Sequence, residues 1–163
     1  MIKILTTGGT IEGLEYDKFN QAPSRAPVTI LKHLQSIENL PSYSIKEIFS
    51  KDSRFITEGD RKLILQEINN TDSQRILITH GTYSMIETAQ YLAKSERNRT
   101  IILTGAFILG NKLNTDAKAN LHYAINQFNE LEVGVFIAIH NETFHWNNVV
   151  KNEFKNRFET VTK

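Results

Sequence analysis

Two threonines follow glycines directly after apolar, β-branched runs, and this arrangement can present a hydroxyl nucleophile. One run near the start of the chain leads into Gly9 and Thr10, and a later run leads into Gly81 and Thr82. Glycine allows a tight turn and lets a substrate approach the backbone closely. The first turn has neither the spaced glycines of a dinucleotide fold nor the lysine of a P-loop. A plain tight turn is the alternative interpretation.

A polar segment at residues 50–54 comes just before a predicted helix start. Thr57 followed by Asp60 resembles a capping box, with Asp in place of the usual Glu. Backbone amides at a helix start bind anions, and Ser53 adds a hydroxyl donor. The segment is therefore a candidate anion site, with an ordinary capped loop as the alternative.

Lys151 follows the last apolar run and is the candidate base. Near a threonine in a partly desolvated pocket, a lysine loses its proton more easily and can act as the general base for that hydroxyl. Most lysines are solvated, which is the alternative interpretation. The five histidines lack the helical i, i+4 pair of a zinc site and the chain has no cysteine, so no metal is expected.

Short β-branched runs alternate with amphipathic stretches along the chain, the pattern of βαβ units. We predict a single, doubly wound, three-layer α/β domain with a mainly parallel sheet, which binds its ligand beyond the carboxyl ends of the strands. Strands are predicted over residues 2–6, 44–49, 75–79, 100–104 and 133–140. Helices are predicted from apolar residues at helical spacing, the first starting beside Pro27 and Thr29: Val28, Leu31 and Leu34; Leu63, Ile64 and Ile68; Met85, Ala89 and Leu92; Leu121, Ala124, Ile125 and Phe128.

The composition is that of one ordinary globular domain. The chain has 163 residues, of which 40% are hydrophobic and 23% charged. A net charge of +1 without a basic stripe argues against a nucleic-acid surface. No stretch approaches the roughly 20 apolar residues of a membrane span, and no signal peptide is recognisable. We therefore expect a cytoplasmic protein with neither a membrane nor a nucleic-acid partner.

These motifs, in this order, resemble the bacterial-type L-asparaginase and glutaminase family, whose members hydrolyse amides with a threonine nucleophile. The sequence TTGGTI at 6–11 is similar to the first family signature, and HGTYSMIETA at 80–89 is similar to the second. The sequences LTGA at 103–106 and TDAKANL at 115–121 are similar to two further family segments. The resemblance covers essentially the whole chain and implies the fold of the family's amino-terminal domain.

The resemblance also implies roles for individual residues. Thr10 corresponds to the nucleophile, Thr82 to the threonine that orients or activates the attacking water, and Lys151 to the lysine that partners it. Tyr16 is the nearest counterpart of a mobile tyrosine that assists the nucleophile, although it stands closer to Thr10 than the family spacing. The expected substrate-binding residues are Gly9, Asp52, Ser53, Arg54, Gly81 and Tyr83.

The implied activity is hydrolysis of L-asparagine or a related small amide through an acyl-enzyme, without a cofactor. The implied partners are a small-molecule amide or dicarboxylic amino acid, and further copies of the chain in a dimer or tetramer. The alternative is a catalytically weak or inactive module that binds a small carboxylate or a partner protein.

Three features depart from the family pattern. Tyr83 stands where the family has an aspartate that holds the substrate's α-amino group, a charged hydrogen bond worth about 1.5 to 3 kcal/mol. Arg54 stands where a small or amide residue is common, and its guanidinium can hold a carboxylate. Family members continue into a second, smaller domain, whereas residues 1–163 are expected to be a stand-alone amino-terminal domain.

Overall fold

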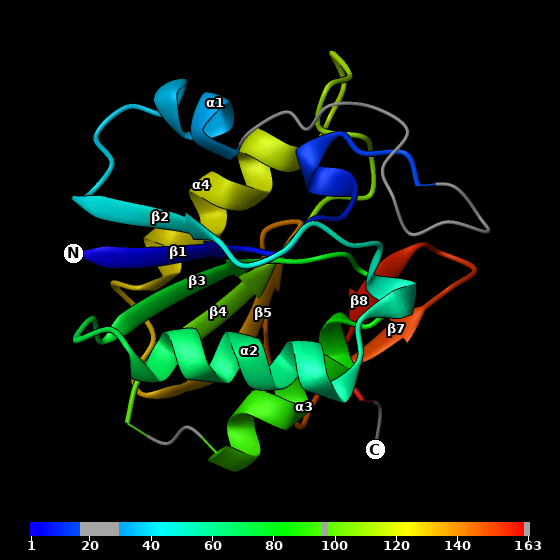
Figure 1. Cartoon of the computed structure of the whole chain (residues 1–163). Coiled ribbons are helices and arrows are strands. Elements are labelled where there is room, and N and C mark those ends of the chain that lie inside the picture. The colour runs from blue at the N-terminus through cyan, green and yellow to red at the C-terminus, as the bar shows by residue number, and fades with distance from the viewer. Residues whose placement is uncertain (17–29, 96–97, 162–163) are drawn as a thin grey trace.

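The computed structural model describes residues 1–16, 30–95 and 98–161 of the chain. Six strands form its central sheet (Figure 1), namely β1 (Ile2–Thr6), β2 (Tyr43–Glu47), β3 (Arg75–Thr79), β4 (Thr100–Thr104), β5 (Gly134–Ile139) and β6 (Glu142–His145). Their order across the sheet is β2-β1-β3-β4-β5-β6. The first five strands are parallel and β6 is antiparallel to β5.

The strand order reverses between β1 and β3, which makes this the switch point of the sheet. Successive connections from there run to opposite edges, so the turns after these two strands diverge and leave a crevice at their carboxyl ends. The register aligns Thr6 with Thr79, the last residues of the two strands. Both glycine and threonine turns therefore begin at the same level, on either side of the crevice.

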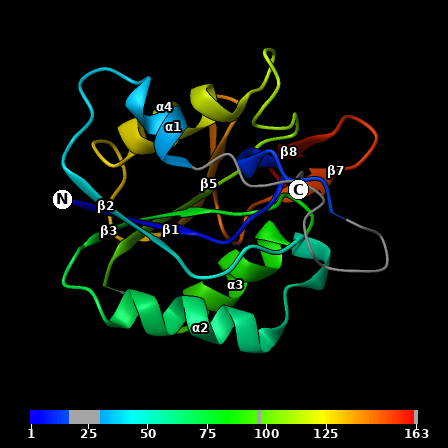
Figure 2. The same cartoon turned by 45° about the horizontal axis from the view of Figure 1, so that its top comes forward.

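Among the described residues, four α-helices cover the two faces of the sheet and complete the three layers (Figures 1 and 2). Helices α1 (Ile30–Gln35) and α4 (Ala117–Gln127) lie on one face. Helices α2 (Glu58–Asn69) and α3 (Met85–Ser95) lie on the other. This arrangement confirms the predicted doubly wound α/β fold with a mainly parallel sheet.

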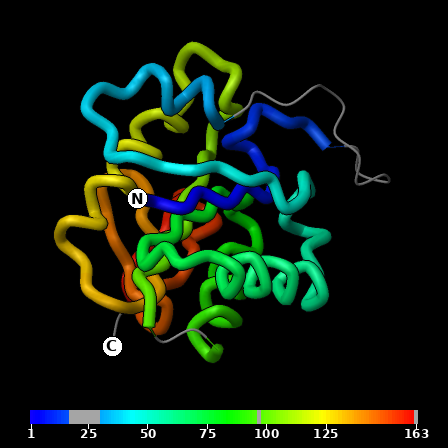
Figure 3. The backbone as a smooth tube through the Cα atoms, turned by 60° about the vertical axis from the view of Figure 1, so that its left-hand side comes forward, coloured from blue at the N-terminus to red at the C-terminus, as the bar shows by residue number. Residues whose placement is uncertain are grey.

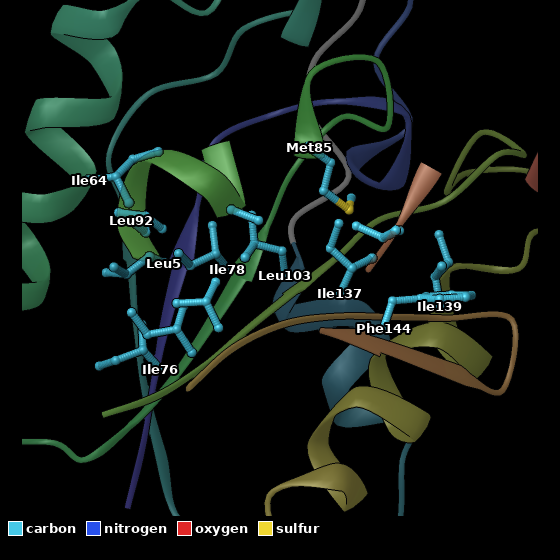
Figure 4. Packing of buried hydrophobic residues seen from close by; sticks show 14 of the residues in the cluster. Leu5, Ile64, Ile76, Ile78, Met85, Leu92, Leu103, Ile137, Ile139 and Phe144 are labelled. Carbon is cyan, nitrogen blue, oxygen red and sulfur yellow. The ribbon is translucent and has the colours of Figure 1, made fainter. Parts of the chain in front are cut away.

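The core consists of two apolar clusters, one on each face of the sheet. Alternate side chains of a strand point to opposite faces. Ile78 of β3 and Leu103 of β4 accordingly pack with Leu92 of α3 in one cluster (Figure 4). Leu77 belongs to the other cluster, together with Leu121 of α4. Burial on both faces explains why the central runs are almost continuously apolar.

The start of α2 is capped as the sequence predicts. The Thr57 hydroxyl accepts a hydrogen bond from Asp60 N at 3.2 Å, and the Asp60 carboxylate accepts one from Thr57 N at 2.9 Å. The predicted apolar stripe of this helix is too wide, because Leu63 is 46% exposed. Leu31 of α1 is likewise 38% exposed, so neither of these leucines belongs to the core.

Strand β2 forms one edge of the sheet, where Figure 3 shows it in cyan beside the dark blue β1. It ends at Glu47, opposite Thr6, whereas the predicted strand continued to residue 49. Pairing stops there because β1 turns away into its glycines. One further backbone hydrogen bond, from Ile48 N to Thr6 O at 2.9 Å, leads the chain toward the carboxyl end of the sheet.

The region after β5 contains three strands that the sequence analysis missed. β5 ends before His140, not at it, because His140 and Asn141 have φ of 53° and 58° and form the two-residue turn into β6. Positive φ at both central residues is the requirement of a type I′ hairpin turn. A second hairpin, β7 (Val150–Asn152) with β8 (Arg157–Glu159), follows as a separate two-stranded sheet.

The predicted first-helix start beside Pro27 and Thr29, and its apolar position Val28, lie outside the described residues. Within the described ranges, no helix has the length and apolar character needed to cross a membrane.

Candidate active site

A pocket opens at the carboxyl ends of β1 and β3, beside the switch point. Its volume of about 210 Å³ lies below the roughly 300 to 1,000 Å³ typical of drug-sized ligand sites, which suits a small metabolite. It combines turns from three separate parts of the chain. The lining residues are Gly9, Thr10, Tyr16, Asp52, Ser53, Arg54, Gly81, Thr82 and Tyr83.

The two glycine turns touch each other at the bottom of the crevice. A Cβ atom on Gly9 would lie 2.7 Å from Gly81 N and 2.8 Å from Gly81 Cα. Gly9 also has a φ of 89°, in the region that side chains with a Cβ rarely adopt. Only glycine at this position lets the turn before Thr10 pack directly on the turn before Thr82.

Hydrogen bonds hold the two strand ends together below the threonines. The backbone N and the hydroxyl of Thr7 both donate to the carbonyl of Thr79, at 3.2 Å and 2.8 Å. Thr10 begins the short 3-10 helix η1 (Thr10–Glu12) and is half-buried, as is Thr82. These hydrogen bonds hold the two strand ends in place, and both threonines remain accessible from the pocket.

A buried polar chain fixes the turn that carries Thr82. His80 Nδ1 lies 2.7 Å from the Gly81 carbonyl and therefore donates to it. Its Nε2 lies 2.9 Å from the Thr88 hydroxyl, which also accepts from Arg61 Nε at 3.0 Å. Burial, together with nearby Arg61, lowers the pKa of His80 to about 4. The imidazole is therefore neutral near pH 7, as this donor and acceptor pattern requires.

Ser53 forms the third wall of the pocket, at the start of the 3-10 helix η2 (Ser53–Phe55). A Cβ on Gly81 would lie 2.5 Å from its Oγ, so the wall packs directly on the second glycine turn. The Ser84 hydroxyl donates to the Ser53 carbonyl at 2.6 Å and strengthens this contact. The predicted candidate anion segment is thereby brought against both threonine turns.

Lys51 and Asp60 anchor the same wall to helix α2. Lys51 Nζ lies 2.8 Å from each carboxylate oxygen of Asp60. Burial acts to raise the pKa of Asp60, but the bonds from Lys51 and Thr57 outweigh it and hold the pKa below its usual value. The charge of this carboxylate is therefore neutralised outside the pocket.

Asp52 and Arg54 form an ion pair within the pocket lining. Oδ1 of Asp52 accepts from Arg54 N, and Oδ2 accepts from Arg54 Nε, each at 2.9 Å. The Nη2 atom of Arg54 also donates to Oδ2. Partial burial acts to raise the pKa of Asp52, but these bonds keep it below the usual value. Arg54 thus holds the carboxylate of Asp52, two residues before it, and the expected binding of a ligand carboxylate by Arg54 stays a prediction.

Tyr16 closes the side of the pocket next to the first glycine turn. Its hydroxyl accepts a hydrogen bond from Gly9 N at 2.8 Å. Burial raises the pKa of Tyr16 to about 12, against the opposing effect of that bond and of the nearby Ser50 hydroxyl. The phenol is therefore protonated at neutral pH and can donate a hydrogen bond into the pocket.

Glu12 is a buried acidic residue that the sequence analysis did not identify. Its Oε1 accepts from Gly8 N at 3.2 Å, beneath the first glycine turn. Burial raises the pKa of Glu12 to about 7, with a further contribution from the charge of Glu47. No sequence pattern signals this environment, because it depends on the packing of segments distant in the chain.

Lys151 is not one of the pocket-lining residues. It lies on β7, with Nζ 3.4 Å from Glu153 Oε1 and 5.8 Å from the centre of the Phe107 ring. The lysine side chain is 13% exposed and that of Glu153 is 69% exposed. Phe107 continues the chain beyond Gly105, where a Cβ would lie 3.5 Å from Thr82 Cγ2. The ammonium group thus lies over the chain segment that borders Thr82.

No set of three or more histidine, aspartate or glutamate side chains in the described part of the chain could hold a metal ion. The pocket offers hydroxyl groups, a phenol, an ion pair and backbone amides. This set can bind a small polar molecule and bring two threonine hydroxyls against it.

Comparisons with known proteins agree with the fold and with the order of the motifs. The model of the asparaginase amino-terminal domain family matches residues 1–162. The probable periplasmic L-asparaginase of Haemophilus influenzae is 29% identical over 161 residues, covering 92% of this chain and 46% of that protein. A glutamyl-tRNA(Gln) amidotransferase subunit of Methanococcus maripaludis is 29% identical over 150 residues, covering 87% of this chain and 35% of that protein.

A solved structure shows the same architecture. The probable cytoplasmic L-asparaginase of Campylobacter jejuni superposes with a TM-score of 0.79 at 26% identity, covering 92% of this chain and 49% of that one. The chain thus spans about half the length of this protein, or less than half in the case of the two curated relatives. Because the family model spans nearly all of the sequence, the chain belongs to the asparaginase family through that family's amino-terminal domain.

Proposed function

We propose that this domain carries the nucleophilic half-site of an asparaginase-like amidohydrolase, with Thr10 as the nucleophile. The observation that supports this most is that Thr10 and Thr82 line one pocket of about 210 Å³. The glycines that precede them, Gly9 and Gly81, pack directly against each other. A hydroxyl nucleophile needs a substrate carbonyl held close to it and a second group that manages protons. Thr10, Thr82 and the Ser53 wall supply these positions.

The proposed reaction has two steps. The Thr10 hydroxyl attacks the side-chain amide carbon, and the amide nitrogen leaves as ammonia after taking up a proton, so that an ester forms on Thr10. Water oriented by Thr82 then hydrolyses the ester and releases the carboxylic acid. Backbone N–H groups at the N-terminus of α3 would stabilise the negative charge on the carbonyl oxygen, because those of Gly8 and Gly9 already donate to Glu12 and Tyr16.

Tyr16 and Lys151 are assigned supporting roles in this proposal. The protonated Tyr16 phenol would donate a hydrogen bond near Thr10. Lys151 would leave Glu153, which its Nζ contacts at 3.4 Å, and move its amine toward Thr82. Glu153 is 69% exposed and water can replace the lysine.

The test is ammonia release from a panel of small amides, among them L-asparagine and L-glutamine. The wild type should release ammonia and Thr10→Ala should lose the activity by about a thousandfold or more. Thr10→Ser, which keeps the hydroxyl, serves as the matched variant and should retain measurable turnover. Unchanged ammonia release in Thr10→Ala would refute the assignment of the nucleophile.

A second candidate function is a binding module without turnover, and the position of Lys151 favours it. Its ammonium group is paired with Glu153 outside the pocket. The amidotransferase relative is named as one subunit of an enzyme, which agrees with a domain that works beside another protein. Stabilisation by small dicarboxylates in a thermal-shift assay, without any amide hydrolysis, would support this function over the first. Light scattering would test the expected dimer or tetramer.

A further inference from the structure

We propose that the pocket selects amides that carry one carboxylate and lack an α-ammonium group, such as the monoamide of a dicarboxylic acid, over zwitterionic amino acids. This inference rests on the proposed function for its catalytic test, but it also predicts a preference in binding alone. The charges that line the pocket favour one kind of ligand over the other.

An α-ammonium group is bound most strongly by an anionic acceptor whose charge is not already compensated. Asp52 is the one carboxylate among the described lining residues. Both of its oxygens accept hydrogen bonds from Arg54, through the backbone N and the guanidinium. Binding an ammonium there would require competition with a guanidinium that donates two hydrogen bonds to Oδ2, and charge-assisted hydrogen bonds are among the strongest that a carboxylate accepts.

Two acidic side chains adjacent to the pocket walls are also engaged. The Glu12 carboxyl bonds Gly8 N beneath the first turn, where burial disfavours its charged form. The Asp60 carboxylate is held by Lys51 Nζ at 2.8 Å from both oxygens. Neither group lines the pocket, so neither supplies the missing anion.

The same lining is well suited to a carboxylate. The bonds to Asp52 use two of the five N–H donors of the Arg54 guanidinium, which leaves three for a ligand. The Ser53 hydroxyl lines the same wall and adds a further donor. Tyr83 also lines the pocket and brings a phenol but no carboxylate.

The catalytic test compares kcat/KM for ammonia release from succinamate and from L-asparagine, which differ only in the α-ammonium group. The wild type should prefer succinamate by at least about tenfold, the factor expected for one uncompensated charged group. Tyr83→Asp, which adds a carboxylate at the rim, should shift the ratio toward L-asparagine by at least about tenfold. Tyr83→Asn is the matched control, because asparagine has about the size of aspartate but no charge, and it should shift the ratio by less than about threefold.

The binding test decides the matter even if the protein has no turnover. Calorimetric titration should give tighter binding of succinate than of L-aspartate, and Arg54→Gln should remove this difference by weakening the binding of succinate. A preference of the wild type for L-asparagine or L-aspartate would overturn the inference, as would an unchanged ratio in Tyr83→Asp. A preference for succinate without any ammonia release dependent on Thr10 would instead uphold the inference and refute the proposed function.

Discussion

The two turns at the switch point and the segment after β5 both carry polar side chains that the proposed mechanism uses, but different interactions position them. The switch-point turns, residues 6–10 and 79–82, follow central strands that are buried on both faces, and they are locked by the contact of Gly9 with Gly81. The segment after β5, residues 140–159, contains β6, which pairs with β5 at the edge of the main sheet, and the separate hairpin of β7 and β8. Backbone geometry dictates the first region, whereas individual side-chain contacts position the second.

This difference shows which site residues can be placed from the sequence: those that directly follow a strand of the main sheet. Thr10 and Thr82 reach one pocket because each follows a strand of the same parallel sheet. Lys151 lies on β7, outside the main sheet, and its ammonium group is placed by Glu153 and the Phe107 ring. The following changes test whether the first region is rigid and the second adjustable.

Gly9→Ala should have the largest effect. The new Cβ would lie 2.7 Å from Gly81 N, at a φ of 89°, and neither backbone segment can move freely. Strain and overpacking together should lower the free energy of unfolding by about 2 to 5 kcal/mol and abolish ligand binding. Gly59→Ala is the matched control in denaturant unfolding, because its new Cβ would meet only the Thr57 hydroxyl, at 3.5 Å. Equal stability of the two variants would show that the turns are not locked.

Lys151→Met tests the adjustable region. If the amine moves toward Thr82 during turnover, this change should lower kcat about a hundredfold, the lower range for a general base, while the fold remains stable. Lys155→Met, on the same hairpin and also paired with a glutamate, should leave kcat unchanged. Equal activity of both variants would remove Lys151 from the proposed mechanism and strengthen the binding-module alternative.

Glu12→Gln tests how the buried carboxyl group beneath the first glycine turn affects the pH dependence of stability. The folded-state pKa of about 7 lies above the ordinary glutamate value of 4.5, so the folded state favours the protonated carboxyl. The contribution of Glu12 to stability is therefore complete below pH 4.5 and is lost as the pH rises through about 7. The uncharged glutamine should stabilise the protein by roughly 3 kcal/mol at pH 8 and hardly below pH 4.5. Chemical denaturation under both conditions measures this, and a pH-independent effect would contradict the account.

Phe154→Ser should have the smallest effect. The side chain projects from the turn between β7 and β8 and is fully exposed. Its removal should change the free energy of unfolding by less than about 0.5 kcal/mol. A larger loss of stability in thermal or denaturant unfolding would show that the second hairpin is more firmly anchored than its contacts indicate.

The sequence predicted the central strands β1, β3 and β4 with their observed bounds, because burial on both faces demands unbroken β-branched runs. β6, β7 and β8 were missed because they are three or four residues long and each has at most one buried residue, so little apolar pattern marks them. The turn at His140 and Asn141 carried a usable signal, since asparagine tolerates positive φ.

The site was predictable to the extent that strand ends define it. Thr10, Thr82 and Ser53 follow strands or precede a capped helix, and the structure places all three on one pocket. The pairing of Asp52 with Arg54, by contrast, follows from the local turn of η2, which no periodicity predicts. The burial of Glu12 depends on chain segments that meet only in the folded protein.

The central claim is that Thr10 attacks an amide carbonyl from the switch-point pocket. Peptide mapping by mass spectrometry, after acid quench during turnover of succinamate or L-asparagine, tests it most directly. We predict an acyl ester on the peptide that contains Thr10, absent from Thr10→Ala. Ammonia release with the ester on another residue, or undiminished release by Thr10→Ala, would contradict the account.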